Sequence, residues 1–148
     1  MEKHELDFVG WRETVSLPKF KLKDLKAKID TGAKTSALHA DKIEMITVDG
    51  KKIVRFLFIT EEGKQVWIKS AFIEERYIKS SNGDKTLRPV VKTEIKMGKE
   101  RFEIEVTLIN RDLMGFKMLI GREALNGRFL INPAKHNLLN KAKKEKPQ

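Results

Sequence analysis

Much of the chain consists of short segments in which apolar and polar residues alternate, the period-two pattern of β-strands with one buried face. Residues 25–29 alternate in this way, and residues 90–97 and 100–109 repeat the alternation around a glycine turn. The dipeptide Asp49-Gly50, typical of tight hairpin turns, lies between two further strand-like runs. The pattern predicts an all-β fold whose strands are joined by tight turns.

The remaining segments add further strands, one hairpin and one short helix. Strands are predicted at residues 8–17, 41–48, 52–60, 65–72, 117–121 and 128–132, a hairpin at 74–89 with its turn at 80–84, and a helix at 122–126 ended by Gly127. Neither an internal repeat nor a linker interrupts residues 8–133. We therefore expect a flexible N-terminus at 1–7, one all-β barrel or sandwich domain at 8–133, and a basic, disordered C-terminal tail at 134–148.

Composition narrows the chemistry. The 148 residues include no cysteine, which excludes disulfides and thiol nucleophiles and fits a reducing compartment. No stretch approaches the ~20 apolar residues of a membrane span, so we expect a soluble, cytoplasmic protein with no membrane partner. The formal charge of +10 favours weak polyanion binding, which we place in the basic tail. A solvated basic surface explains this charge more simply than a dedicated nucleic-acid site does.

One acidic residue stands out in the basic stretch 25–40. Asp30 follows directly on a predicted strand, Thr31 places a hydroxyl beside it, and Gly32 permits a tight turn. By itself this pattern fits either an ordinary side-chain-capped turn or a functional carboxylate at a strand end.

A second motif, Met118-Leu119-Ile120-Gly121-Arg122, makes the functional reading specific. The combination of this motif with Ile29-Asp30-Thr31-Gly32-Ala33 resembles the retropepsin-like aspartic peptidases. Residues 10–13 and 29–40 are also similar to the bacterial branch labelled ATP-dependent zinc proteases, and the likeness extends over about residues 9–133. It implies a small closed or partly open six-stranded barrel of the acid-protease type, with one short helix near the C-terminus.

The resemblance also assigns roles to residues. It makes Asp30 the catalytic carboxylate, Thr31 the residue that locks two such turns together, and Gly32 and Ala33 the backbone beside the substrate. It makes residues 77–87 a flap, whose tip would hold Ser81, Asn82 and Gly83. Supporting residues are Lys34, Gly121, Arg122 and Glu123.

Lys34 departs from the retroviral pattern. Retroviral members place an aspartate at this position, where it pairs with the arginine of the Gly-Arg motif. We expect a contact between Lys34 and Glu123 to replace that pair.

The implied chemistry needs two carboxylates that share a proton, one acting as base toward water and the other as acid toward the carbonyl oxygen. The chain contains the Asp-Thr-Gly motif once, so the second carboxylate must come from a second copy across a two-fold axis. The sequence thus predicts a homodimeric aspartic endopeptidase that acts on peptides or proteins and needs no cofactor.

Three alternatives stay open. The domain could bind peptides without cutting them, associate with ribosomes or nucleic acid, or work as a zinc-dependent peptidase. Zinc has little support, because His4, His39 and His136 are widely spaced and no His-Glu-x-x-His occurs, so we assign no metal ligands. The chain also lacks a phosphate-binding Gly-x-x-x-x-Gly-Lys motif for ATP.

Overall fold

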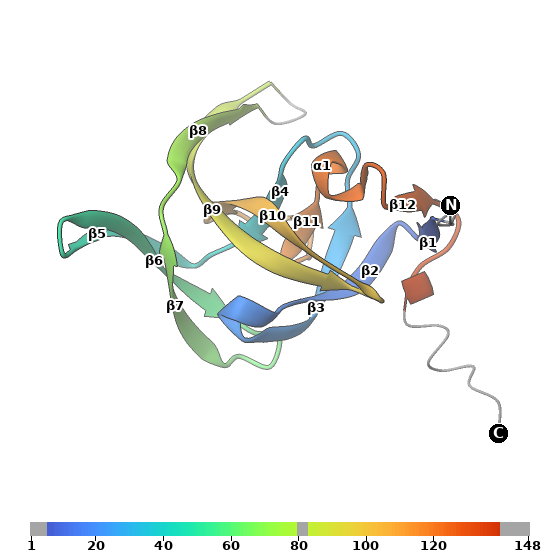
Figure 1. Ribbon diagram of the computed structural model, residues 1–148, viewed down its shortest axis with the longest axis horizontal. Helices are drawn as coiled ribbons and strands as arrows, with labels where there is room; N and C mark the ends of the chain where they lie inside the picture. The colour runs from blue at the N-terminus through green and yellow to red at the C-terminus, as the bar shows by residue number, and fades with distance from the viewer. Residues whose placement is uncertain (1–5, 80–82, 140–148) are drawn as a thin grey trace, which may run out of the picture.

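The computed structural model describes residues 6–79 and 83–139, which form a β-barrel with a three-stranded sheet projecting from one side (Figure 1). The elements, in chain order, are β1 (Asp7–Val9), β2 (Arg12–Leu17), a 3-10 turn (Pro18–Phe20), β3 (Leu22–Ile29), β4 (Ser36–His39), β5 (Lys42–Val48), β6 (Lys51–Ile59), β7 (Gln65–Ala71), β8 (Glu74–Lys79), β9 (Lys85–Met97), β10 (Glu100–Ile109), β11 (Met118–Ile120), α1 (Arg122–Leu125) and β12 (Phe129–Ile131). No helix in these ranges has the length and apolar character needed to cross a membrane.

Six strands close the barrel. They are hydrogen-bonded in the order β10, β4, β11, β3, β2 and β9, and β9 pairs again with β10 to complete the ring. The first half of β9 pairs instead with β8, which extends the sheet beyond the barrel. The predicted six-stranded barrel with one short helix is therefore confirmed, and it is closed.

The alternation read from the sequence corresponds to the barrel interior. Leu25, Ala27 and Ile29 of β3 are buried. The same holds for the alternating apolar residues in the second half of β9 and of β10, which are Val91, Ile95, Met97, Ile104, Val106 and Leu108. Gly98 turns the chain between these two strands with a φ of 60°. Burial of one face of each strand is the main source of hydrophobic stabilisation here.

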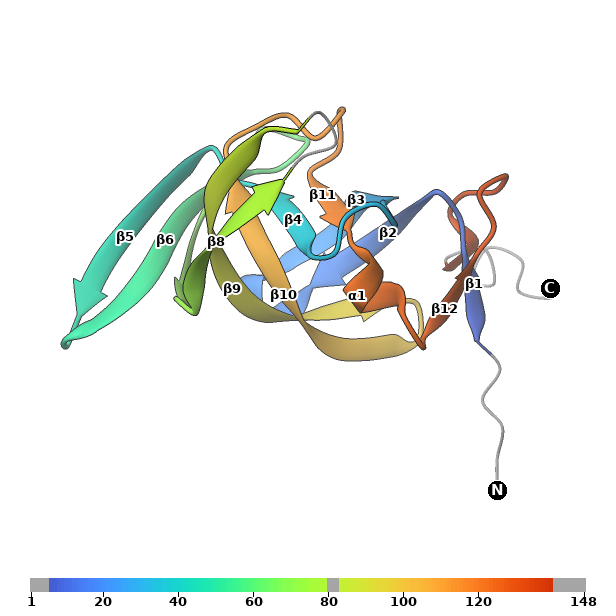
Figure 2. The same ribbon diagram turned by 90° about the horizontal axis from the view of Figure 1, so that it is seen from above.

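The projecting sheet consists of β5, β6 and β7, and its β5–β6 hairpin is the part farthest from the two chain ends (Figure 2). Asp49 and Gly50 make the predicted turn, both with positive φ angles, of 51° and 78°. The inner face of β6 joins the barrel core through Phe56, whose ring meets Phe20 edge-on at 5.5 Å. On the exposed face, the guanidinium of Arg55 lies 3.8 Å from the ring centre of Trp67.

The two ends of the described chain lie together. The strand predicted at residues 8–17 is split: β1 pairs in parallel with β12, the chain bends at Gly10, and β2 then enters the barrel. A Cβ atom at Gly10 would lie 2.2 Å from the Lys135 carbonyl oxygen, so only glycine permits this close approach.

Residues 134–139, which the sequence assigned to a disordered tail, pack against the barrel. The buried carboxylate of Glu13 accepts N–H groups from Gly10 at 2.7 Å, Leu138 at 2.9 Å and Leu139 at 3.1 Å. The domain limit at residue 133 is thus corrected for these six residues. The buried carboxylate of Glu13 on β2 accepts the backbone N–H groups of Leu138 and Leu139, which water would otherwise have to accept.

Candidate active site

Asp30 lies at the point where β3 leaves the barrel. Its N–H donates to the carbonyl of Ile120 on the neighbouring β11, at 2.9 Å, which fixes the end of the strand. One carboxylate oxygen, Oδ1, accepts the N–H of Gly32 at 3.0 Å, and the Asp30 carbonyl accepts the N–H of Ala33 at 3.2 Å. Among the described residues the second oxygen, Oδ2, has no partner. The Asp30 turn, residues 30–33, therefore presents one oxygen of a half-buried carboxylate for chemistry.

The Gly-Arg motif holds this turn in place. The N–H of Arg122 donates to the Ala33 carbonyl at 2.8 Å, and its Nη1 donates to the carbonyls of Thr31 and Gly32, both at 3.3 Å. A guanidinium carries several donors in a fixed plane, which suits it to span two carbonyls at once. The two motifs that the sequence separates by about ninety positions are thus brought together as predicted.

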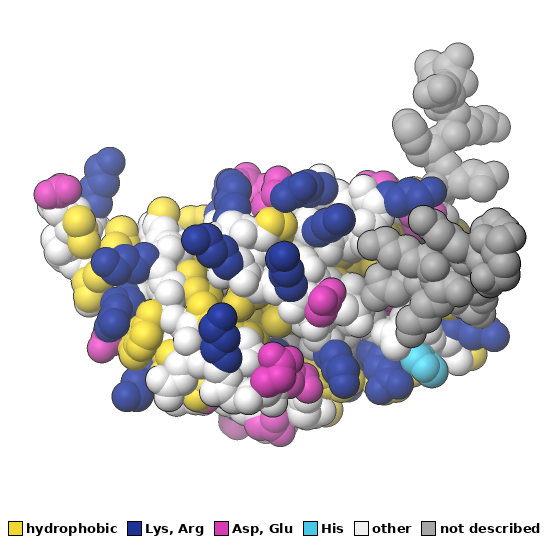
Figure 3. Space-filling view, turned by 90° about the horizontal axis from the view of Figure 1, so that it is seen from below, with side chains coloured by type: hydrophobic (Ala, Val, Ile, Leu, Met, Phe, Trp, Pro, Cys, Tyr) yellow, Lys and Arg dark blue, Asp and Glu magenta, His cyan; other side chains and the backbone are white. Residues whose placement is uncertain are grey.

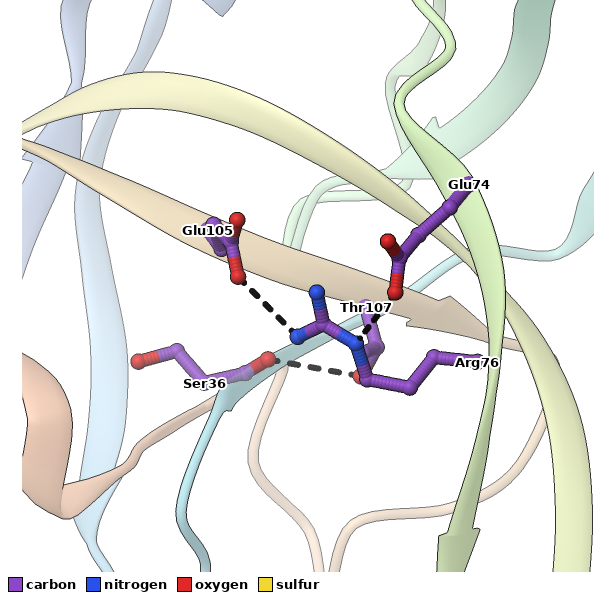
Figure 4. Close-up of polar contacts among 5 residues, drawn as sticks. All are labelled: Ser36, Glu74, Arg76, Glu105 and Thr107. Atoms are coloured by element: carbon purple, nitrogen blue, oxygen red, sulfur yellow. Dashed lines mark hydrogen bonds and ion pairs between the residues drawn. The ribbon is translucent and has the colours of Figure 1, made fainter.

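Gly121 is required by its surroundings. A Cβ atom at this position would lie 2.7 Å from the carbonyl carbon of Thr35, so a side chain would force the two loops apart. Its N–H donates to Ser36 Oγ at 3.0 Å, and the Ser36 carbonyl accepts the hydroxyl of Thr107 at 3.3 Å (Figure 4). These contacts tie β11 to β4, and β4 to β10, directly behind the Asp30 turn.

The expected pairing of Lys34 with Glu123 occurs through the backbone only. The N–H of Glu123 donates to the Lys34 carbonyl at 3.1 Å, whereas no ion pair joins their side chains, both of which belong to exposed, described residues. The two residues are therefore in contact through a backbone hydrogen bond, and not through an ion pair of the kind that the retroviral aspartate forms. The backbone bond arises because α1 begins directly after Gly121, and its free N–H groups find the carbonyls of residues 33 and 34.

A groove of about 550 Å³ opens beside Asp30. Its floor and walls come from the Asp30 turn, β4, the β8–β9 hairpin and the loop between β10 and β11; the lining residues are Lys28, Asp30, Gly32, Ala33, Thr35, Ala37, Ile78, Lys79, Arg88, Arg111, Asp112, Leu113, Met114 and Leu119. Four of these carry positive charge and two carry negative charge, one of the two being Asp30 itself. The groove therefore combines a carboxylate with apolar surface and an excess of positive charge.

The β8–β9 hairpin supplies one wall of the groove, where the resemblance placed a flap. Ile78 and Lys79 line the groove, while Ser81 and Asn82 lie outside the described residues. Gly83, with a φ of 92°, leads into β9 and does not itself line the groove. The hairpin is thus found at the expected place, and the roles of its tip residues stay predictions.

Two arginines of the groove were missed by the sequence reading. Arg88 on β9 is only 8 % exposed, although it follows a polar stretch. Arg111 belongs to the β10–β11 loop, and its backbone carbonyl oxygen lies 2.7 Å from Nδ1 of His39. The one available signal was that Arg88 immediately precedes the apolar run Pro89-Val90-Val91, which places it at the entrance of a buried strand.

Two of the three histidines, His39 and His136, lie in the described residues, and neither belongs to a cluster of metal ligands. His39 is half-buried, and its ring nitrogens face Arg111 and Asp41. Within residues 6–79 and 83–139, no three His, Asp or Glu side chains are grouped as metal ligands.

Comparison with known proteins now adds to this geometry. A family model described as retropepsin-like aspartic endopeptidase RimB matches residues 8–142. The chain belongs to this RimB-like family. The retropepsin-like description of this family agrees with the closed six-stranded barrel of the chain.

Similar curated proteins are longer and carry a different name. A probable alpha-L-glutamate ligase from Desulfotalea psychrophila is 39% identical over 140 residues, which are 93% of this chain but 30% of that protein. A probable alpha-L-glutamate ligase from Shewanella pealeana is 36% identical over 129 residues, 85% of this chain and 28% of that protein. The chain therefore spans less than a third of the length of these relatives.

Among solved structures, a Legionella pneumophila protein of unknown function has the same fold. It superposes with a TM-score of 0.74 at 29% identity, over 91% of this chain and 99% of that one.

Proposed function

We propose that this RimB-like domain is an aspartic peptidase whose active site forms when two copies bring their Asp30 carboxylates together. The observation that carries the proposal is the Asp30 turn, which holds a carboxylate at the end of a strand. One carboxylate oxygen accepts the Gly32 N–H, and the other has no partner among the described residues. The side chain of Arg122 donates to the carbonyls of Thr31 and Gly32 in the same turn. A carboxylate held this rigidly is pre-organised to activate water beside a bound peptide.

The chemistry follows from two carboxylates that share one proton. The ionised Asp30 takes a proton from a water molecule, whose oxygen attacks the peptide carbonyl carbon. The protonated Asp30 of the second copy gives its proton to the carbonyl oxygen, and a tetrahedral diol results. In the second step the first Asp30 gives the proton that it took from water to the amide nitrogen, while the Asp30 of the second copy takes a proton from one hydroxyl of the diol. The C–N bond then breaks to leave a carboxylic acid and an amine, and the pair again holds one proton. Like charges this close cannot both ionise, so the pair titrates as a unit.

Two exposed features support self-association. Thr31 and Gly32 lie at the surface, so the Asp30 turn can meet its symmetry copy without rearrangement of the barrel. Phe8 and Leu130 stand opposite each other on the β1–β12 ribbon, and they are 53% and 46% exposed. Contact between copies at this ribbon would remove the apolar surface of both side chains from water. An isologous dimer would place each Asp30 opposite its own copy.

The groove favours acidic peptides. The two arginines and two lysines that line the groove would repel basic substrates and attract carboxylates. The curated relatives are named for an alpha-L-glutamate ligase activity, and we propose glutamate-rich chains as the substrate class of this domain. Ligase activity itself is not part of the proposal, because the chain spans only 30% of the first of those relatives.

The test is cleavage of a glutamate-rich peptide and of its glutamine counterpart by the purified protein, with products identified by mass spectrometry. Asp30→Asn should abolish cleavage while the thermal transition stays unchanged. Asp112→Asn is the matched control, because it removes the other carboxylate of the groove, whose Oδ1 accepts the Gly115 N–H in its own loop. Sedimentation at several concentrations should show activity rising with the dimer fraction. Wild-type cleavage rates in Asp30→Asn would sink the proposal.

A further inference from the structure

Two arginines of the β8–β9 hairpin stand directly opposite each other and have contrasting surroundings. Arg76 of β8 and Arg88 of β9 are cross-strand partners, so their side chains leave the ribbon on the same face. Arg76 is the more exposed of the two and forms ion pairs with two carboxylates. Its Nε donates to Glu74 at 2.8 Å, and its Nη1 donates to Glu105 on β10 at 3.0 Å (Figure 4). These hydrogen bonds raise the pKa of Arg76.

Arg88 is more deeply buried and lacks such partners. Its Nε donates to the neutral hydroxyl of Thr86 at 2.8 Å, and no described Asp or Glu forms an ion pair with it. Burial, and then the charge of Arg111, lower the pKa of the Arg88 guanidinium. A buried cation beside a second cation is costly unless an anion completes the site.

The groove offers no internal anion for this role. Of its two acids, Asp112 is engaged with the N–H of Gly115 at 3.1 Å, and Asp30 is held in its turn. The two lysines of the groove are poorer candidates for specific binding, since Lys79 is exposed and the Nζ of Lys28 lies 3.6 Å from Met114 Sδ. A guanidinium in a partly dehydrated wall binds a carboxylate in a fixed, two-point geometry that an exposed ammonium does not impose.

We infer that Arg88, with Arg111 beside it, is the residue that determines substrate specificity by binding one carboxylate of the peptide as it lies against Asp30. This inference rests on the proposed peptidase function and specifies which residue of the groove reads the substrate. The carboxylate can come from an acidic side chain or from the free C-terminus of the peptide, which have the same chemistry.

Kinetics test the inference with pairs of peptides that differ at one position. Arg88→Met should raise KM for a peptide with glutamate near the scissile bond by about ten- to a hundred-fold, the value of one hydrogen-bonded charge pair. Cleavage of the matching glutamine peptide should change less than about three-fold, and Arg88→Lys should restore part of the loss. Arg101→Met is the matched control, because it removes an exposed arginine of β10 that is paired with Glu94. Equal loss for both peptides would overturn the assignment.

Binding to the Asp30→Asn variant separates this inference from the peptidase proposal. That variant should bind the glutamate peptide whether or not the wild type cuts it, and adding Arg88→Met should weaken binding by the same factor. Amidation of the peptide C-terminus distinguishes the two sources: weaker binding after amidation assigns the chain end, and unchanged binding assigns the side chain. If Arg88→Met leaves affinity unchanged for every acidic peptide while the protein stays folded, Arg88 does not read the substrate.

Discussion

Glu13 provides the sharpest test of how the C-terminal segment is attached. Its carboxylate is 1% exposed and accepts three N–H groups, two on Oε2 and one on Oε1. In Glu13→Gln, the amide oxygen can keep the two donors from Gly10 and Leu138 at the strength of neutral hydrogen bonds. The amide nitrogen then faces the Leu139 N–H, so that two donors meet.

The magnitude follows from these three contacts. Hydrogen bonds to a charged group contribute about 1.5–3 kcal/mol each against about 1 for neutral ones, and an unsatisfied buried donor costs about 1–3 kcal/mol. We therefore expect Glu13→Gln to lower the free energy of unfolding by about 2–4 kcal/mol, which for a chain of this size lowers Tm by roughly 5–15 °C. Glu103→Gln is the matched control, since Glu103 is exposed and forms a 3.8 Å pair with Lys92, and it should change stability by less than about 0.5 kcal/mol.

Urea unfolding followed by tryptophan fluorescence measures the loss, and hydrogen exchange locates it. The amides of Leu138 and Leu139 should exchange much faster in the variant, while those of β9 and β10 change little at first, because the segment can detach before the barrel opens. A loss below about 1 kcal/mol with unchanged exchange at both leucines would refute the reasoning.

Three further changes test the packing around the Asp30 turn and the attachment of the projecting sheet. Gly121→Ala should destabilise the protein by about 1–3 kcal/mol in chemical denaturation, because its Cβ would lie 2.7 Å from the carbonyl carbon of Thr35; a neutral result would show that the loops can move apart. Arg122→Met removes the two 3.3 Å hydrogen bonds to the Asp30 turn, and should lower kcat at least ten-fold with a smaller effect on KM. If the variant is largely unfolded at the assay temperature, as judged from its Tm, the loss of activity reflects unfolding instead. Phe56→Ala, at a fully buried ring, should cost about 3–5 kcal/mol by denaturant titration, and a cost under about 1 would mean that the projecting sheet folds independently of the barrel.

The sequence predicted the parts of this molecule that depend on local physics. Strand alternation along β3, β9 and β10, the Asp49-Gly50 turn and the helix ended by Gly127 follow from periodicity and from residues that adopt positive φ. The Asp30 turn and the Gly-Arg motif could be paired because together they resemble the retropepsin-like aspartic peptidases.

The missed features depend on contacts between distant segments. The apolar run after Arg88 indicates a buried strand, but it does not show that Arg111, more than twenty positions later, lies beside Arg88 in the groove. The lysine-rich composition of the C-terminal region likewise concealed residues 134–139, whose docking needs a carboxylate 125 positions earlier in the chain. The sequence also did not show that the contact between Lys34 and Glu123 would be a backbone hydrogen bond, because this bond depends on α1 beginning directly after Gly121.

The hydrogen bond from Asp30 to Ile120, with the Arg122 contacts to the same turn, has a consequence for biosynthesis. A chain emerging from the ribosome presents Asp30 early, but the residues that fix its position are made about ninety positions later. Since a domain generally folds as a unit, the carboxylate stays unfixed until β11 and α1 have been synthesised. Nascent chains that stop before residue 120 therefore carry the Asp-Thr-Gly motif without the contacts that hold Asp30 in position.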